Sequence, residues 1–176
     1  MKSVLISIQP KWCELIASGK KTVEVRKTKP KLEAPFKVYI YCTKGKHEAL
    51  WRYGCSYCYD TQFPNERPNK VNGKVIGEFV CDNIRTFEFG AEYYQTLVGS
   101  CLTGNEVWAY GKGGTLYGWH ISNLVIYDKP RELSEFIKPC PTPFQCDKCN
   151  DLVEHFGCGR TITRPPQSWC YVESES

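Results

Sequence analysis

The chain has 176 residues, of which 41% are hydrophobic, 24% charged and 14% aromatic. This is the composition of one folded domain with room for an appendage, and it excludes both a disordered chain and two full domains. No run of about 18 apolar residues could span a bilayer, and the apolar stretch at residues 4–8 is too short for the core of a signal peptide. We therefore expect a cytoplasmic protein without membrane contact.

Positive charge is concentrated in the first part of the chain. The formal net charge is +4, but residues 1–50 carry 11 lysines and arginines against 4 acidic residues, which leaves the remainder slightly acidic. A local excess of this kind suits an anionic partner such as a phosphate backbone. A solvated lysine-rich surface would give the same pattern, so both interpretations stay open.

Alternating apolar residues predict strands, and helical spacing with capping residues predicts helices. Strands are expected over residues 4–8, 21–27, 36–42, 75–81 with a continuation to 87, and 116–127 with a bend at residues 122–123; helices are expected over 10–19, 92–98 and 103–110. In the first helix Trp12, Leu15 and Ile16 form the apolar stripe. The strand over 21–27 has Glu24 and Arg26 on its polar face.

The order of these elements favours an α+β fold, a small mixed β-barrel with short flanking helices. Strands and long helices do not alternate regularly, which argues against a doubly wound parallel sheet. Residues 43–73 form a long polar insertion, and connections of that length are usually functional. After residue 138 the sequence becomes rich in Cys and Pro, which predicts a barrel domain over 1–138 and a Cys-rich extension over 139–176. Within it, residues 163–171 are expected to be extended and to pack back across the barrel.

Residues 19–26 (GKKTVEVR) match the pattern GxKxxExR. Together with the preceding strand and helix, the strand VIGEFVC and the segment GWHISNLVIYDKPRELSEF, they make residues 3–137 resemble the ASCH domain family of the PUA-like superfamily, in its bacterial and phage form. The resemblance implies a β-barrel that binds RNA or a nucleotide in a cleft beside the signature. It also implies that some members are enzymes, among them small proteins that deacylate N4-acetylcytidine and proposed ribonucleases.

The signature residues have the chemistry that a nucleotide needs. The guanidinium group of arginine is a planar fork and the ammonium group of lysine a point charge, and both can hold a phosphate or a base edge. A carboxylate accepts a hydrogen bond from the exocyclic amine of a base. We therefore expect Lys21, Glu24 and Arg26 to bind RNA or a modified nucleotide in a basic cleft. The alternative is an ion pair between Glu24 and Arg26 that only holds strands in register.

Aromatic residues near the cleft could stack a base. The candidates are Trp12, Tyr110 and Trp119, and each could equally belong to the core.

A hydrolase is the alternative function. The resemblance implies that deacylating members use a lysine, a threonine three residues later and a glutamate on a later strand. Here Lys21 is present, but Glu24 occupies the threonine position, and Glu78 is the candidate for the later glutamate. If the protein is an enzyme, Lys21 and Glu24 are the catalytic candidates. A ribonuclease would need a base and an acid, for which Lys21 and His120 could serve.

Eleven cysteines without an export signal argue against a disulfide framework. Four of them, in apolar or helical patterns, are expected in the core: Cys13, Cys42, Cys81 and Cys101. Four others have spacing suited to a structural Zn²⁺ site: Cys140, Cys146, Cys149 and Cys158.

The ligand set of this zinc site stays open. Cys55 and Cys58 could instead join Cys146 and Cys149, which would tie the insertion to the extension, and His155 or Cys170 could replace one ligand. Absence of metal is the third alternative. Independently of the metal, a protein-interaction role is a third possible function, in which residues 43–73 or the extension contact a protein partner and the cleft is vestigial.

Metal analysis tests the zinc hypothesis. Protein purified without chelator should contain about one equivalent of zinc, because four thiolates form a closed tetrahedral site. Protein that contains no zinc would eliminate the hypothesis.

Overall fold

The computed structural model describes residues 2–45, 50–52, 55–56, 69–88, 98–140 and 160–173. The elements, in chain order, are β1 (Lys2–Ile8), α1 (Pro10–Ala17), β2 (Val23–Arg26), β3 (Phe36–Cys42), β4 (Leu50–Arg52), β5 (Cys55–Ser56), β6 (Asn69–Lys70), β7 (Val75–Cys81), β8 (Ile84–Phe87), α2 (Gly104–Gly111), β9 (Leu116–His120), β10 (Ser122–Arg131), the 3₁₀ helix η2 (Leu133–Glu135) and β11 (Trp169–Glu173). No helix in these ranges is long and apolar enough to cross a membrane.

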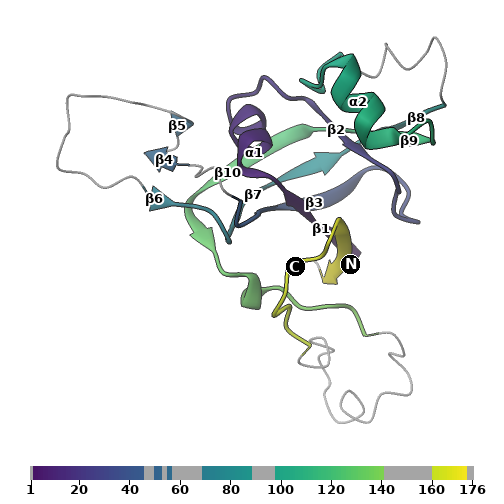
Figure 1. Ribbon diagram of the computed structural model, residues 1–176. Helices are drawn as coiled ribbons and strands as arrows, with labels where there is room; N and C mark the ends of the chain where they lie inside the picture. The colour runs from purple at the N-terminus through teal and green to yellow at the C-terminus, as the bar shows by residue number, and fades with distance from the viewer. Residues whose placement is uncertain are drawn as a thin grey trace, which may run out of the picture.

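A five-stranded sheet of order β10-β7-β3-β1-β11 forms the centre of the molecule (Figure 1). Its strands are antiparallel except for β1 and β3, which are parallel. A second sheet of order β2-β9-β8 is antiparallel, and β5-β4-β6 form a small third sheet. The predicted α+β class is confirmed. The predicted closed barrel is not, since the strands of the described ranges are hydrogen-bonded in open sheets.

Both faces of the central sheet are covered, which explains why β1 is buried almost throughout. Val4, Ile6 and Ile8 face a cluster that includes residues of α1 and β9. Leu5 faces the opposite cluster, which contains Tyr39 of β3 and residues after β10. The side chains of β1 therefore alternate between the two faces of the sheet, as predicted, and each face packs against an apolar cluster.

The first helix begins and ends where its residues predict. Pro10 occupies the first turn, and Gly19 follows the helix with a φ of +71°, a conformation that favours glycine. The predicted apolar stripe is only partly right. The buried residues are Pro10, Cys13 and Ile16, whereas Trp12 is half-buried, because it packs against the core on one side and borders a cavity on the other.

Two predicted strands each divide between the two sheets. The strand over 75–87 breaks at residues 82–83, so β7 lies in the central sheet and β8 in the second. The strand over 116–127 divides into β9 and β10 near the predicted bend, where Asn123 has a φ of +46°. A hydrogen bond of 2.6 Å between His120 Nδ1 and Asp82 Oδ1 joins these two corners.

The capping box of α2 is confirmed, with Thr103 and Glu106 bonded reciprocally. Three of the four cysteines predicted for the core are buried, but Cys101 is exposed. It lies in the loop before α2 with a φ of +59°, and its thiol donates to the Lys20 carbonyl. The predicted helix over 92–98 lies outside the described residues except for its last position, and so does most of the insertion.

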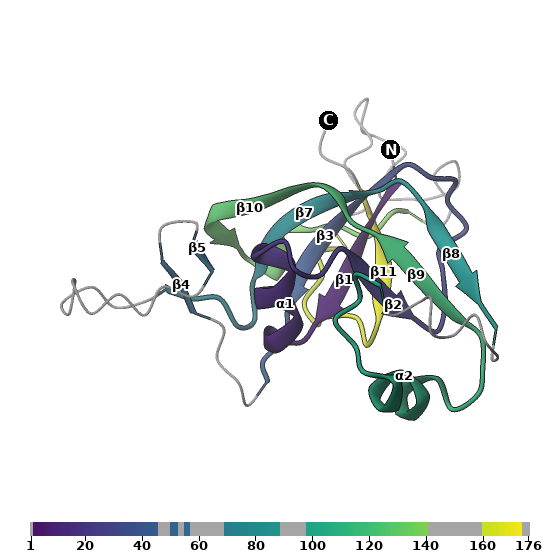
Figure 2. The ribbon, with the colours of Figure 1, turned by 90° about the horizontal axis from the view of Figure 1, so that it is seen from above.

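The C-terminal segment packs back onto the domain, as predicted. β11 pairs with β1 in the register Lys2↔Glu173, so the two ends of the described chain lie side by side (Figures 1 and 2). Ile162 is fully buried in the cluster around Tyr39, and its N–H donates to the Phe136 carbonyl at 2.8 Å. The division of the chain at residue 138 stays a prediction.

Shortening Ile162 tests whether the C-terminal segment stabilises the domain. Ile162→Ala should lower the free energy of unfolding by roughly 2–5 kcal/mol, because it leaves a cavity in the core. Thr163→Ala, at the exposed neighbouring position, should change it by no more than about 0.5 kcal/mol. Urea denaturation measures both, and equal small effects would contradict the packing.

Candidate nucleotide-binding site

A cavity of about 910 Å³ lies where the end of β1, both helices and β2 meet. In both views β2 lies between α1 and α2 (Figures 1 and 2). Residues 165–168, just before β11, complete the lining. The size is that of a pocket for a small organic ligand.

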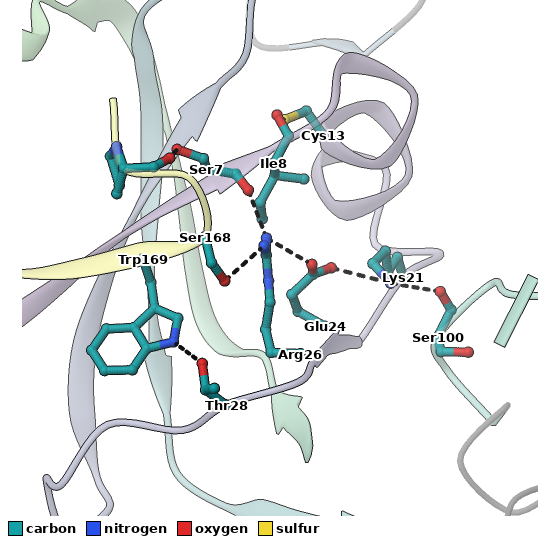
Figure 3. Close-up of polar contacts among 11 residues, drawn as sticks. Ser7, Ile8, Cys13, Lys21, Glu24, Arg26, Thr28, Ser100, Ser168 and Trp169 are labelled. Carbon is teal, nitrogen blue, oxygen red and sulfur yellow. Dashed lines mark hydrogen bonds and ion pairs between the residues drawn. The ribbon is translucent and has the colours of Figure 1, made fainter. Parts of the chain in front are cut away.

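Three charged residues of the signature meet in the wall of this cavity (Figure 3). Glu24 Oε2 lies 3.2 Å from Lys21 Nζ, and Glu24 Oε1 lies 3.0 Å from Arg26 Nη2. All three side chains are buried, with Lys21 only 2% exposed. One carboxylate therefore pairs with two cations, and the triad keeps one net positive charge.

Each cation of the triad is also bound to a backbone carbonyl. Lys21 Nζ donates to the Ser100 carbonyl at 2.6 Å, which holds the loop before α2. Arg26 Nη2 donates to the Ser7 carbonyl at 2.7 Å, and Nη1 donates a long bond of 3.5 Å to Ser168 Oγ. The buried Arg26 Nε has no hydrogen-bond partner in the described part of the chain. The Arg26 guanidinium is thus fixed in position, and its Nε–H has no acceptor among the described residues.

The alternation of β2 explains why Glu24 and Arg26 meet, and Lys21 reaches Glu24 from just before the strand. Val25 points into a separate apolar cluster with Val107 of α2 and Leu116 of β9. Its neighbours Glu24 and Arg26 consequently point to the other face, where the cavity lies. The structure therefore brings the three predicted signature residues together, and it also contains the Glu24–Arg26 ion pair of the structural alternative.

The three aromatic candidates have different environments. Trp119 is fully buried in the core and does not line the cavity, so the stacking role predicted for it is wrong. Trp12 lines the cavity, and two ammonium groups already lie against its ring. Lys11 Nζ is 4.4 Å and Lys21 Nζ is 5.2 Å from the ring centroid. Tyr110 lines it as well, and Lys27 Nζ lies 5.0 Å from its ring.

The two helices that bear Trp12 and Tyr110 are joined by an ion pair. Lys11 Nζ of α1 lies 3.4 Å from Glu106 Oε1 of α2. Glu106 is also the third residue of the capping box, and hydrogen bonds from the backbone and side chain of Thr103 lower the pKa of its carboxyl. Glu106 is therefore a capping carboxylate at the cavity and is kept ionised.

Of the residues proposed for hydrolysis, Lys21 and Glu24 line the cavity, whereas Glu78 and His120 do not. Glu78 lies on β7 outside it, where it accepts hydrogen bonds from Lys37 at 2.8 Å and from Tyr127 at 2.6 Å. Burial raises the pKa of Glu78, but these two bonds together bring it below its usual value. His120 lies outside the cavity as well, in its pair with Asp82. The described carboxylates that line the cavity are those of Glu24 and Glu106.

Sequence reasoning missed the contribution of β1 and of residues 165–168. Ser7 is 7% exposed and donates through Oγ to the Pro166 carbonyl at 2.7 Å. A serine inside an apolar strand is a local signal that a polar partner lies opposite it. No local signal connects Ser168 with Arg26, because the two are 142 positions apart. Arg164 is exposed and does not line the cavity.

The zinc hypothesis stays a prediction. Of its four cysteines only Cys140 lies in the described residues, as a free thiol. Of the alternative ligands, Cys58 and His155 also lie outside them, while Cys170 is a free, half-buried thiol of β11. Within the ranges that the structure covers, no three His, Cys, Asp or Glu residues are grouped as metal ligands.

The sequence model of the ASCH domain matches residues 6–127, and the chain belongs to this family. ASCH domains are associated with RNA binding.

Solved structures support the same fold. The chain is similar over 97% of its length to the crystal structure of ASCH from Zymomonas mobilis, covering 87% of that chain, with a TM-score of 0.60 and 17% identity. A mutant of the same protein, ZmASCH, is matched over 98% of this chain and 91% of that one, again with a TM-score of 0.60 and 17% identity. No curated protein sequence matches this chain.

Removing the charge of Glu24 tests how far the triad is buried. Glu24→Gln should destabilise the protein by roughly 3–5 kcal/mol, because it leaves two buried cations without their counter-charge. Glu135→Gln makes the same change in a half-exposed pair, 2.9 Å from Arg131, and should cost less than about 1 kcal/mol. Equal costs in urea denaturation would show that water screens the triad.

Proposed function

We propose that the cavity beside the GxKxxExR signature binds single-stranded RNA or a nucleotide. The observation that carries this proposal is the net positive charge of the Lys21–Glu24–Arg26 triad in the wall of an open cavity. A buried, uncompensated positive charge is costly, and an anion that enters the cavity lowers that cost. A phosphate group is the anion that an arginine fork fits best.

The mouth of the cavity supplies what a nucleotide needs besides charge. Tyr110 is 37% exposed and borders the cavity, so a base can stack on its ring. The exposed Lys27, close to that ring, can meet a phosphate of the same nucleotide. A ring and a cation side by side match the alternation of bases and phosphates along a strand.

Binding is favoured over hydrolysis by the state of the cavity's carboxylates. Glu24 is held between two cations, and Glu106 is held by its capping bonds and Lys11. Neither is available to take a proton from water, which a deacylase or a ribonuclease requires of its general base. We therefore rank hydrolysis of an acylated nucleoside and RNA cleavage below binding.

Replacing Tyr110 tests the binding proposal. Tyr110→Ala should weaken the binding of a labelled single-stranded RNA about tenfold in fluorescence anisotropy, because one stacked base contributes roughly 1–3 kcal/mol. Trp108→Ala is the matched control, since Trp108 lies on the same helix, is 52% exposed and does not line the cavity. Equal losses from the two variants would contradict a binding site in the cavity.

Two further readouts belong to the same experiment. The affinity should fall with salt, and Lys27→Ala should reduce the slope of that dependence by about one. Incubation with total RNA and acylated nucleosides, followed by mass spectrometry, covers the enzymatic alternative. If the wild-type protein makes a product that the folded Lys21→Ala variant does not make, the protein is an enzyme and the proposal that it only binds is wrong.

A further inference from the structure

Lysines alternate with other residues along the loop that follows β2. Residues 27–31 read Lys-Thr-Lys-Pro-Lys, and all three lysines are exposed. The two residues between them attach the loop to the domain. Thr28 Oγ1 accepts a hydrogen bond from Trp169 Nε1 at 3.0 Å, and Pro30 is buried (Figure 3). Every second position of this short segment therefore presents a positive charge to solvent.

The backbone of this loop is held in place at further points. The Lys31 N–H donates to the Tyr171 hydroxyl oxygen at 2.8 Å, and Leu32 packs against the main hydrophobic core. Tyr171, like the tryptophan that bonds to Thr28, belongs to β11. The lysines thus project from a backbone that is already ordered, and a ligand that binds them does not have to order the loop.

Two of these lysines lie against tyrosine rings. Lys27 Nζ is 5.0 Å from the ring of Tyr110, and both residues line the cavity. Lys29 Nζ is 5.3 Å from the ring of Tyr117, and neither of these two lines it. Tyr117 of β9 lies directly opposite Arg26 of β2, so their side chains share one face of the second sheet. The pairing of a lysine with a tyrosine at the cavity is therefore repeated just outside it.

The positive charge of the loop is not balanced by carboxylates. None of the three lysines forms an ion pair with a carboxylate in the described part of the chain, and residues 27–35 contain one acidic residue, Glu33. Residues two positions apart are separated by at most about 7 Å between their Cα atoms. A free nucleotide has its phosphate at one place, whereas a strand has a phosphate at every nucleotide. A row of lysines that leads away from the cavity consequently suits a strand.

We propose that Lys27, Lys29 and Lys31 form a phosphate track that continues the cavity, and that the ligand is a single strand of RNA rather than a free nucleotide. This inference rests on the proposed function, since it assigns the class of ligand that the binding site takes. One base of the strand stacks on Tyr110, and the phosphates that follow it lie along the track. The strand is single because a base that stacks in the cavity is not paired.

The dependence of affinity on ligand length tests the track. Fluorescence anisotropy measures the binding of a labelled random-sequence RNA octamer, and competition measures an equimolar mixture of the four nucleoside monophosphates. The octamer should bind more tightly than the monophosphates. Lys29→Ala and Lys31→Ala should each weaken octamer binding about threefold at low salt and lower the slope of its salt dependence by about one. Neither variant should change the affinity for the monophosphates.

Lys129→Ala is the matched control for the loss of an exposed lysine. Lys129 lies on β10, at the edge of the central sheet opposite β11, whereas the track is attached to β11. This variant should leave both the affinity for the octamer and the salt slope unchanged. Lys29→Arg keeps the positive charge and should bind the octamer as the wild type does, because the track meets phosphates through charge.

The outcomes separate this inference from the proposed function. Equal affinity for the octamer and the monophosphates would overturn the track and leave nucleotide binding intact. The same conclusion would follow if Lys29→Ala and Lys31→Ala had no larger effect than Lys129→Ala. Equally tight binding of a double-stranded RNA of the same length would show that the ligand is not a single strand. Binding of neither the octamer nor the monophosphates would overturn both proposals.

Discussion

The carboxylate of Glu24 is the interaction on which the site depends. It forms ion pairs with Lys21 and Arg26, which are both almost completely buried. Each of these cations also donates a hydrogen bond to a backbone carbonyl from another part of the chain. Lys21 thereby fixes the loop before α2, and Arg26 fixes the end of β1. The same three side chains hold the walls of the cavity and give it positive charge, so the fold of this region and the charge of the cavity depend on the same interactions.

The second constraint is the pairing of the C-terminal segment with the edge of the central sheet. β11 pairs with β1, and the residues just before it reach the cavity. The chain between the end of the family match at residue 127 and β11 therefore leads back to the signature rather than away from it. A segment that follows the residues matched by the family model therefore lines the same cavity as the signature.

Much of the fold could be predicted from local patterns. β1, α1 and the capping box of α2 follow from apolar alternation, Pro10, Gly19 and the Thr103–Glu106 pair, all of which act within a few residues. The bend between β9 and β10 was predicted at Ser122 and Asn123. The break between β7 and β8 was harder to predict, because a corner between sheets interrupts an apolar pattern only briefly. The exposure of Cys101 depends on a loop conformation that its residue type does not indicate.

The sequence by itself determined the family, the α+β class and the signature residues. The spacing of Glu24 and Arg26 along one strand is enough to place these two on one face, whereas Lys21 lies before that strand. The tertiary structure decided that this face is buried, that Trp119 belongs to the core and that Glu78 lies outside the cavity. It also decided that residues 165–168 complete the site. Those outcomes depend on which distant segments pack together, and spacing within a segment carries no information about that.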